Sequence, residues 1–121
     1  MKTILVVEAV ASQRQLLVQW LKDDYTVLTA ADGAGGLALA ERTDPDLIFV
    51  ALTLPGSADG EGIQRLKVQA RRRDTPVIAL TAQAGPDAAA QARAAGYADA
   101  IRLPLEEEQV YATLGKWLGG G

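Results

Sequence analysis

Short runs of consecutive apolar residues recur along the chain and predict its strands. Four runs are clear and a fifth is weaker; they cover residues 3–7, 26–29, 46–52, 76–81 and 99–103. Runs of four to seven aliphatic and β-branched residues without polar alternation are typical of strands that are buried on both faces. We therefore expect five strands in a sheet that is covered on both sides.

The segments between these runs carry apolar side chains at helical spacing. The five expected helices are marked by Leu16, Leu17, Trp20 and Leu21; by Leu37 and Ala40; by Ile63, Leu66 and Ala70; by residues 88–95; and by Val110, Leu114 and Trp117 or Leu118. Ser12 is the expected N-cap of the first helix, and Gly33 precedes the second. Strands that alternate with helices are joined by right-handed crossovers, so we predict an α/β fold with a parallel sheet and helices on both faces.

The composition removes several kinds of chemistry. The chain has 121 residues, with 15 acidic and 12 basic side chains, a net charge of −3, and neither cysteine nor histidine. This length fits one domain, which we place at residues 1–118, with the glycines at 119–121 as a frayed end or the start of a linker. Without cysteine and histidine the chain has no thiol nucleophile, no histidine base and no thiolate or imidazole ligand for zinc.

The apolar runs and the net charge indicate where the protein is located and which partners it binds. No apolar run approaches the roughly 20 residues that span a bilayer, and no charged start leads into an apolar signal core, so we expect a cytoplasmic protein without membrane contact. Mild net acidity argues against nucleic acid as the main partner, with the run Arg71, Arg72 and Arg73 as a local exception. No glycine loop precedes a Lys-Ser/Thr pair and no base and nucleophile are paired, so we expect no enzymatic activity.

Ligands of an open parallel sheet gather at the carboxyl ends of its strands. The residues at these ends are Glu8 and Ala9, residues 51–53, Thr81 and Ala82, and Leu103 and Pro104. Any site chemistry is therefore expected among these positions.

A set of short motifs follows the strand pattern along nearly the whole chain: Lys2 to Glu8, Ala31-Asp32-Gly33, Pro45 to Ile48, Leu54-Pro55-Gly56 with Asp59-Gly60, Pro76 to Ala82, Ala95-Gly96 and Pro104. These motifs resemble those of the receiver domains of two-component response regulators, the CheY-like family. Each motif is weak alone, but their order and spacing together are specific. The resemblance implies a flavodoxin-like sheet of order 2-1-3-4-5 and a role in phosphorelay signalling.

The resemblance also implies where the family's phosphorylation pocket lies. In the family, an acidic pair binds magnesium, an aspartate accepts a phosphoryl group, a hydroxyl follows that group, a lysine pairs with it, and an aromatic residue in the last strand acts as a switch. The matching positions here are Glu8 and Ala9, Ala51, Thr81, Leu103 before Pro104, and Ala100. The pocket is thus expected to be degenerate, with no catalytic residue, no cofactor, and weak or absent magnesium binding for which Glu8 is the residual candidate.

A shift of register does not restore the missing acceptor aspartate. Moving Asp46 into the place of Ala51 breaks the match at residues 54–56 and puts the carboxylate at the start of the third strand, about 17 Å from its other end. Asp59 lies beyond the following loop, where the family already has an aspartate with another task. We conclude that the acceptor is replaced rather than displaced.

Two functions are compatible with these observations. The first is a phosphorylation-independent receiver that binds a signalling protein, with the fourth helix, fifth strand and fifth helix as the docking or homodimer face that the resemblance implies. The second is a sensor of an anionic small ligand, such as a cyclic dinucleotide, at Arg71, Arg72 and Arg73. Arginines at a helix end also have a simpler explanation, because they interact favourably with the helix dipole there.

Overall fold

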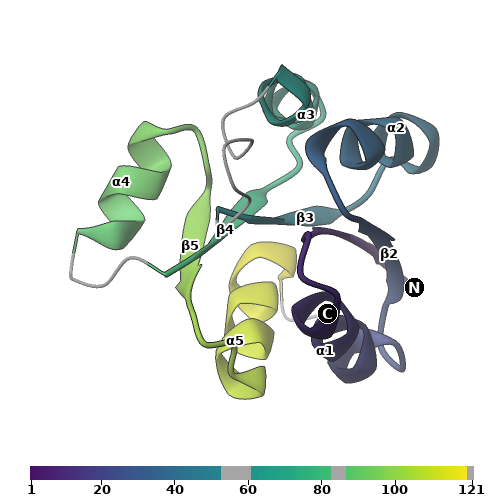
Figure 1. The fold of residues 1–121 in the computed structure, drawn as a ribbon, viewed down its shortest axis with the longest axis vertical. Coiled ribbons are helices and arrows are strands. Elements are labelled where there is room, and N and C mark those ends of the chain that lie inside the picture. Colours follow the sequence, from purple (N-terminus) through teal and green to yellow (C-terminus); the bar gives the residue numbers. More distant parts are fainter. Residues whose placement is uncertain (53–60, 83–86, 120–121) are drawn as a thin grey trace.

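The sheet has the architecture that the sequence predicts. A computed structural model of the chain describes residues 1–52, 61–82 and 87–119 (Figure 1). Its strands are β1 (Thr3–Val7), β2 (Thr26–Ala30), β3 (Leu47–Ala51), β4 (Val77–Thr81) and β5 (Asp99–Arg102). They pair in parallel in the order β2-β1-β3-β4-β5, which confirms the predicted topology.

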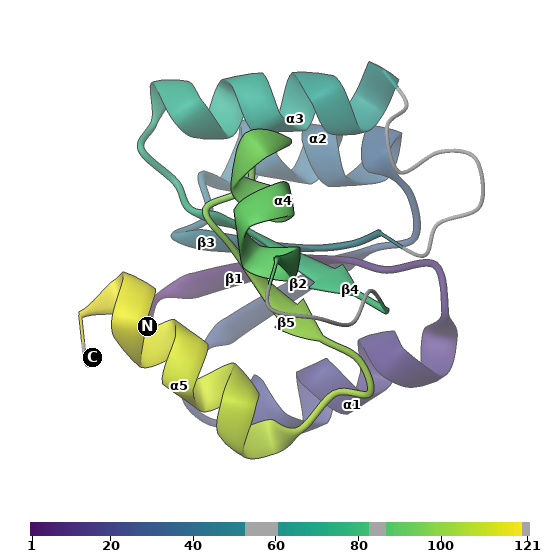
Figure 2. The ribbon, with the colours of Figure 1, turned by 90° about the vertical axis from the view of Figure 1, so that its left-hand side faces the viewer.

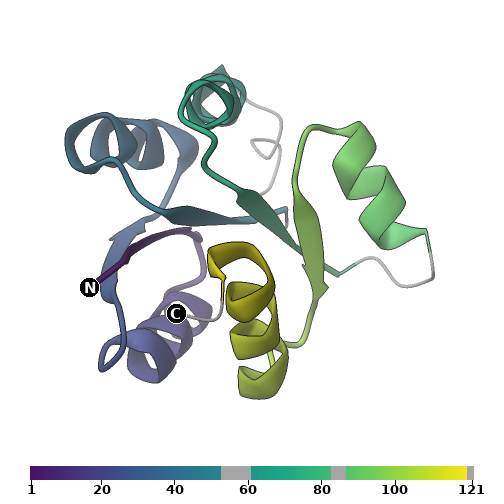
Figure 3. The ribbon, with the colours of Figure 1, turned by 180° about the vertical axis from the view of Figure 1, so that it is seen from behind.

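The helices of the described residues cover the sheet on both faces. They are α1 (Ala11–Leu21), α2 (Gly33–Thr43), α3 (Glu61–Arg72), α4 (Ala88–Ala94) and α5 (Glu107–Leu118). Helices α1 and α5 lie on one face, and α2, α3 and α4 lie on the other (Figures 2 and 3). None of these helices, within the part of the chain that the structure describes, is long and apolar enough to cross a bilayer.

Alternate side chains of each strand enter two separate apolar layers. On the face of α1 and α5, Ile4, Val6 and Phe49 belong to one cluster of fully buried residues. On the opposite face, Leu5 and Val7 join the second cluster, under α2 and α3. All five residues of β3 and of β4 are buried, which explains why these strands read as continuous apolar runs.

The start of α1 differs from the sequence prediction. The helix begins at Ala11 after Val10, whose side chain makes no cap, so Ser12 lies inside the first turn and the prediction of Ser12 as the N-cap is wrong. The Glu8 carboxylate, two residues before the cap position, accepts a hydrogen bond from the Val10 amide at 2.9 Å instead. At α2, by contrast, Asp32 caps locally by accepting from the Gly35 amide at 2.7 Å.

Candidate functional site

The carboxyl ends of the strands bring the expected site positions to one edge of the sheet. Ala51 ends β3 in register with Leu80, and Thr81 ends β4 in register with Arg102. Leu103 continues this edge, since its amide donates to the Thr81 carbonyl at 2.8 Å. Ala51 is fully buried and Thr81 is buried as well. The edge that the sequence singles out is therefore formed by a small methyl group and a buried hydroxyl.

Glu8 follows β1 and is completely buried. Its Oε1 accepts from the Val10 amide at 2.9 Å, whereas Oε2 is buried without a hydrogen-bond partner among the described residues. Arg14 reaches back from α1, and its Nη1 donates to the Glu8 carbonyl at 2.7 Å. A carboxylate at the first amides of a helix is stabilised by the helix dipole, so Glu8 acts here as the cap of α1.

The remaining positions of the expected pocket are apolar. Ala9 is exposed beside Glu8, and Leu103 is half-buried against the same apolar cluster that contains Ala51. Pro104 is exposed directly after Leu103. Within residues 1–52, 61–82 and 87–119, no three Asp, Glu, His or Cys side chains come together in an arrangement that could hold a metal ion.

Asp46 lies at the opposite edge of the sheet from Ala51. Its Oδ2 accepts from the Thr3 amide at 2.7 Å, and its own amide donates to the Thr3 carbonyl at 2.8 Å. These bonds fix Asp46 where β1 and β3 begin, five residues before Ala51. The motif at residues 54–56 and Asp59 lie outside the described residues.

Ala100, which the resemblance puts at the family's switch position, is not aromatic. Ala100 is half-buried in β5 in register with Ala79. The nearest aromatic residue in sequence, Tyr97, is buried just before β5, at the amino edge of the sheet, with the Lys67 Nζ 4.6 Å from its ring centre. Tyr97 thus lies at the other end of the strand from Thr81 and Leu103.

A polar cluster that sequence reasoning missed joins β5 to α5. The Trp117 indole Nε1 donates to Asp99 Oδ2 at 3.0 Å, and Lys116 Nζ lies 3.3 Å from the same oxygen. Burial acts to raise the pKa of Asp99, but hydrogen bonds from Trp117, from the Ala100 amide and from Lys116 outweigh it, and the pKa lies below the ordinary value of 3.8. No local motif connects residues 18 positions apart, so the sequence carries no signal for this contact.

The face expected for docking contains a groove of about 460 Å³. It is lined by Ala100, Arg102, Leu103, Pro104, Glu106 and Gln109. Leu103 and Ala100 are half-buried there, and Arg102 and Glu106 are exposed. The groove therefore combines apolar walls with charges of both signs at the start of α5.

The three arginines at the end of α3 lie in different surroundings. Arg73 donates to Asp44 Oδ1 at 3.1 Å and forms an ion pair with it. Arg72 lines a groove between α2 and α3, whereas Arg71 lines a pocket on the side of α4. The run of sequence is continuous, but its side chains diverge because successive residues of a helix point about 100° apart.

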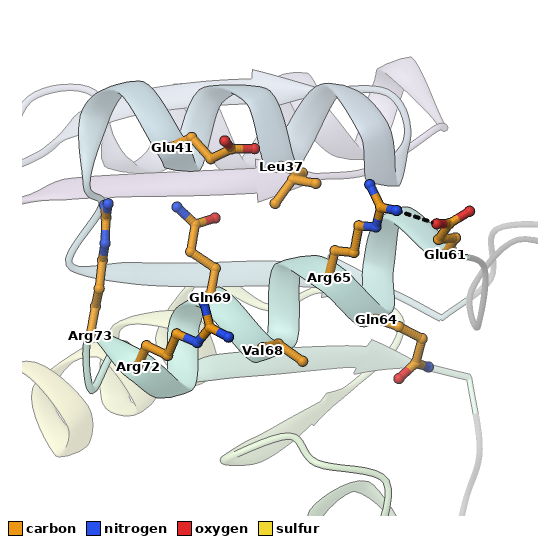
Figure 4. A pocket seen from close by; sticks show the side chains of 9 residues that line it. All are labelled: Leu37, Glu41, Glu61, Gln64, Arg65, Val68, Gln69, Arg72 and Arg73. Atoms are coloured by element: carbon orange, nitrogen blue, oxygen red, sulfur yellow. Dashed lines mark ion pairs between the residues drawn. The ribbon is translucent and has the colours of Figure 1, made fainter.

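The groove between α2 and α3 has a volume of about 680 Å³ (Figure 4). Side chains of α3 line one wall, and Leu37 and Glu41 of α2 line the other. Arg65 is paired with Glu61 one turn earlier, and Val68 is a large apolar side chain that is 49% exposed. The lining of the groove contains two glutamates and three arginines. Because Arg65 and Arg73 are already paired with carboxylates, the groove presents no concentrated charge that would select a ligand.

The sequence of the chain is similar to known signalling proteins. Residues 4–114 match the response regulator receiver domain family. The sensor histidine kinase AruS of Pseudomonas aeruginosa is 34% identical over 117 residues, which cover 93% of this chain and 12% of the kinase. The response regulator PleD of Caulobacter vibrioides is 32% identical over 110 residues, 90% of this chain and 24% of PleD. The protein PilH of Pseudomonas aeruginosa is 27% identical over 121 residues, 99% of this chain and 100% of PilH.

Solved structures agree with the sequence matches. The chemotaxis protein CheY4 of Vibrio cholerae superimposes with a TM-score of 0.84 at 28% identity, over 97% of this chain and 98% of that chain. The receiver domain of the sensor histidine kinase PA1611 of Pseudomonas aeruginosa, crystallised with magnesium in its active site cleft, gives 0.81 at 28% identity over 98% of both chains. The chain spans less than a quarter of both AruS and PleD but matches PilH from end to end. The chain therefore belongs to the response regulator receiver domain family of two-component signalling.

Proposed function

We propose that this receiver works without phosphorylation, as a protein-interaction module in a signalling pathway. The observation that carries the proposal is Ala51, which ends β3 at the position where the family has its acceptor aspartate. Transfer of a phosphoryl group to a side chain requires a nucleophile, and a methyl group supplies none. Asp46, the carboxylate directly before β3, accepts from the Thr3 amide at the opposite edge of the sheet.

The donor set also does not fit the magnesium ion that the family implies. Magnesium favours six oxygen ligands in a near-octahedral shell, with one or two carboxylates among them. Glu8 is the one carboxylate among the positions that match the family's pocket, and its Oε1 already accepts from the Val10 amide. Ala9 and Ala51 offer methyl groups in place of ligands. We therefore propose that magnesium binding is weak or absent, and no step of the function is assigned to it.

Leu103 also argues against phosphorylation, because it offers no positive charge to balance a phosphoryl group. A phosphoryl group carries negative charge that cations must neutralise, and the family places a lysine before the last proline for this purpose. Leu103 is half-buried against the apolar cluster that includes Ala51. An aliphatic side chain at this place lowers the polarity of the edge and offers no counter-charge.

The docking face that we propose consists of α4, β5 and α5. Its groove of about 460 Å³ has apolar walls at Ala100 and Leu103 and exposed charges at Arg102 and Glu106. Asp99 holds α5 against β5 through Trp117 and Lys116, so the two elements present one fixed surface. A fixed surface favours binding because little conformational entropy is lost when a partner docks. The partner is expected to be a signalling protein, with a second copy of the chain as the alternative occupant.

Phosphorylation is tested by incubating the chain with acetyl phosphate, or with beryllofluoride, in the presence of magnesium. We expect no mass increase and no magnesium-dependent amide shifts around Glu8 and Thr81. The matched positive control is the triple variant Ala9→Asp, Ala51→Asp and Leu103→Lys, which restores the family's residues and should regain magnesium binding. A phosphorylated wild-type chain, or shifts at these residues that require magnesium, contradicts the proposal.

The docking face is tested by affinity capture of signalling proteins with charge-reversed variants. Arg102→Glu and Glu106→Lys change the groove, and Arg42→Glu is the control because α2 contacts β1 and β2, away from β5. We expect the first two variants to lose the receiver's partner and the control to retain it. Equal capture by all three variants would place the interface elsewhere.

A further inference from the structure

A pocket of about 270 Å³ lies at the amino edge of the sheet, opposite the edge that carries Glu8 and Thr81. It is lined by Lys67, Ala70, Arg71, Thr75, Pro76, Val77, Arg93, Gly96, Tyr97 and Ala98. These residues come from the ends of α3 and α4 and from the starts of β4 and β5, where Figure 2 shows the end of α4 below α3. The pocket is thus distinct from the family's phosphorylation site.

The described lining of this pocket is basic and contains no acidic side chain. Its three charged residues are Lys67, Arg71 and Arg93. Lys67 is only 8% exposed, donates from Nζ to the Ala95 carbonyl at 2.7 Å and lies over the Tyr97 ring. A positive charge that is held in a buried wall acts through a lower dielectric than a charge in water, so its attraction for an anion is stronger.

Two of these cations lie beside Gly96. Gly96 adopts a φ of 101°, and the position that a Cβ atom would take there lies 3.8 Å from both Arg71 Nη2 and Lys67 Nζ. The two nitrogens are therefore separated by no more than twice that distance. The absence of a side chain at Gly96 leaves open the space between them.

Arg71 and Arg93 are not needed as hydrogen-bond donors to the last carbonyls of α3 and α4, because these carbonyls have other partners. The Ala70 carbonyl accepts from the Thr75 amide, the Ala92 carbonyl accepts from the Tyr97 amide, and the Ala95 carbonyl accepts from Lys67. Among the residues that the structure describes, the guanidinium groups of Arg71 and Arg93 make no hydrogen bond or ion pair, whereas Arg65 and Arg73 are both paired. The donors of Arg71 and Arg93 are thus available to a ligand.

We propose that this pocket binds the phosphate group of a small phosphorylated molecule. The arginine fork matches phosphate oxygens in pairs, and the buried lysine adds a fixed charge behind them. The volume is slightly below the range of about 300–1,000 Å³ that is usual for drug-sized ligands. The ligand is therefore a phosphate ester no larger than a mononucleotide, and a cyclic dinucleotide at Arg71, Arg72 and Arg73 is disfavoured because Arg72 and Arg73 face another groove.

Binding here would act on the connection that leads into β5. Lys67 donates to the Ala95 carbonyl. Residues 96–98 then connect Ala95 to β5, which begins at Asp99. A ligand that draws Lys67 and Arg71 together changes the position of this connection and, through it, α4. The inference does not rest on the proposed loss of phosphorylation, because the two sites lie at opposite edges of the sheet.

The test is calorimetric titration of the purified chain with inorganic phosphate, AMP, adenosine and cyclic di-GMP at low ionic strength, with amide chemical shifts as a second readout. We expect phosphate and AMP to bind and to shift Gly96, Tyr97 and Ala98, while adenosine does not bind. Arg71→Ala combined with Arg93→Ala should weaken AMP binding by roughly tenfold or more, since each arginine supplies charge-assisted hydrogen bonds.

The matched control is Arg42→Ala combined with Arg72→Ala, which removes the same charge and includes the neighbour of Arg71 in the sequence. This control should retain AMP binding within about twofold at a given ionic strength. All four residues are exposed, so both double variants should keep the thermal stability of the wild type. An absence of phosphate and AMP binding, an equal loss in the two double variants, or shifts confined to another surface each overturn the proposal, as does tighter binding of cyclic di-GMP than of AMP.

Discussion

Trp117 donates its indole N–H to Asp99 Oδ2 at 3.0 Å and so fastens the last helix to the last strand. The same carboxylate accepts from the Ala100 amide through Oδ1 at 2.8 Å and lies 3.3 Å from Lys116 Nζ. Only 14% of the Asp99 side chain is exposed, compared with 57% of that of Lys116. The carboxylate therefore connects two elements that the proposed docking face requires to be fixed.

Acid should weaken the fold through Asp99. Its hydrogen bonds stabilise the charged form and lower its pKa below 3.8, so the folded chain keeps the proton off at a pH where the unfolded chain takes it up. The resulting stabilisation is complete above the unfolded pKa and is lost as the pH falls from about 4 through the folded pKa. Urea unfolding at several pH values should show Asp99→Asn to be less stable than the wild type near neutral pH, with a difference that shrinks as the pH falls below 3.8.

The control for this prediction is Trp117→Phe, which retains an aromatic ring but removes the N–H donor. It should bring the pKa of Asp99 closer to its ordinary value and make the acid dependence shallower than in the wild type. An unchanged acid dependence in both variants would show that Asp99 does not link α5 to β5 in solution.

Alkaline conditions should weaken the contact between α5 and α1. The Tyr111 hydroxyl lies 2.7 Å from the Trp20 carbonyl oxygen and 2.8 Å from Asp24 Oδ2, and its single proton serves these two acceptors. Burial, together with the hydrogen bond to Asp24, raises the pKa of Tyr111 to about 12 from 10.0. The unfolded tyrosine ionises first, so stability is complete below pH 10 and declines as the pH rises toward 12.

Tyr111→Phe removes this dependence and the hydrogen bond together. We expect a loss of about 1 kcal/mol near neutral pH and a weaker decline between pH 10 and 11 than in the wild type, measured by urea unfolding. The variant keeps Tyr25 and Tyr97, so the difference between the two proteins isolates Tyr111. A wild-type chain that is as insensitive as the variant above pH 10 would refute the contact with Asp24.

Glu8 should stabilise the fold mainly through the hydrogen bond that its carboxylate accepts at the start of α1. Glu8→Ala removes the acceptor for the Val10 amide and should cost about 1–2 kcal/mol in the free energy of unfolding. Glu8→Gln retains an oxygen at the same place and should stay within about 1 kcal/mol of the wild type. Equal losses in the two variants, or stabilisation of the wild type by millimolar magnesium in thermal melts, would assign the carboxylate another role.

Gly62 and Gly115 should respond in opposite directions to replacement by alanine. A Cβ atom on Gly62 would lie 2.7 Å from the Ala34 amide nitrogen, because α3 starts directly against the first turn of α2. Gly62→Ala should therefore cost about 1–3 kcal/mol. A Cβ atom on Gly115 meets nothing within 4 Å, and Gly115→Ala inside α5 should stabilise by about 0.5–1 kcal/mol. Chemical unfolding of both variants checks how closely α3 packs on α2. A neutral effect of Gly62→Ala would contradict this close contact.

The elements of the fold could be predicted from the sequence because they depend on local patterns. The run at residues 3–7 coincides with β1, and the run at 76–81 differs from β4 by one residue. Burial on both faces forces such runs to be apolar at every position, which makes them visible without a structure. Ser12 was predicted wrongly as the cap of α1 because residue type alone cannot show that Glu8, further back along the chain, reaches the Val10 amide.

The sequence by itself determined the alternation of strands and helices and the residue types at the ends of the strands, while the strand order followed from the family resemblance. Ala9, Ala51 and Leu103 can be read without coordinates, since the order of the motifs fixes which residue follows which strand. The tertiary structure alone decided which side chains meet across the fold. In the folded chain Glu8 is a buried cap of α1, and Asp99 accepts from Trp117. Arg71 lies in one pocket with Lys67 and Arg93, away from its neighbours Arg72 and Arg73. Contacts of this kind depend on helix rotation and on elements far apart along the chain, and local sequence patterns carry neither.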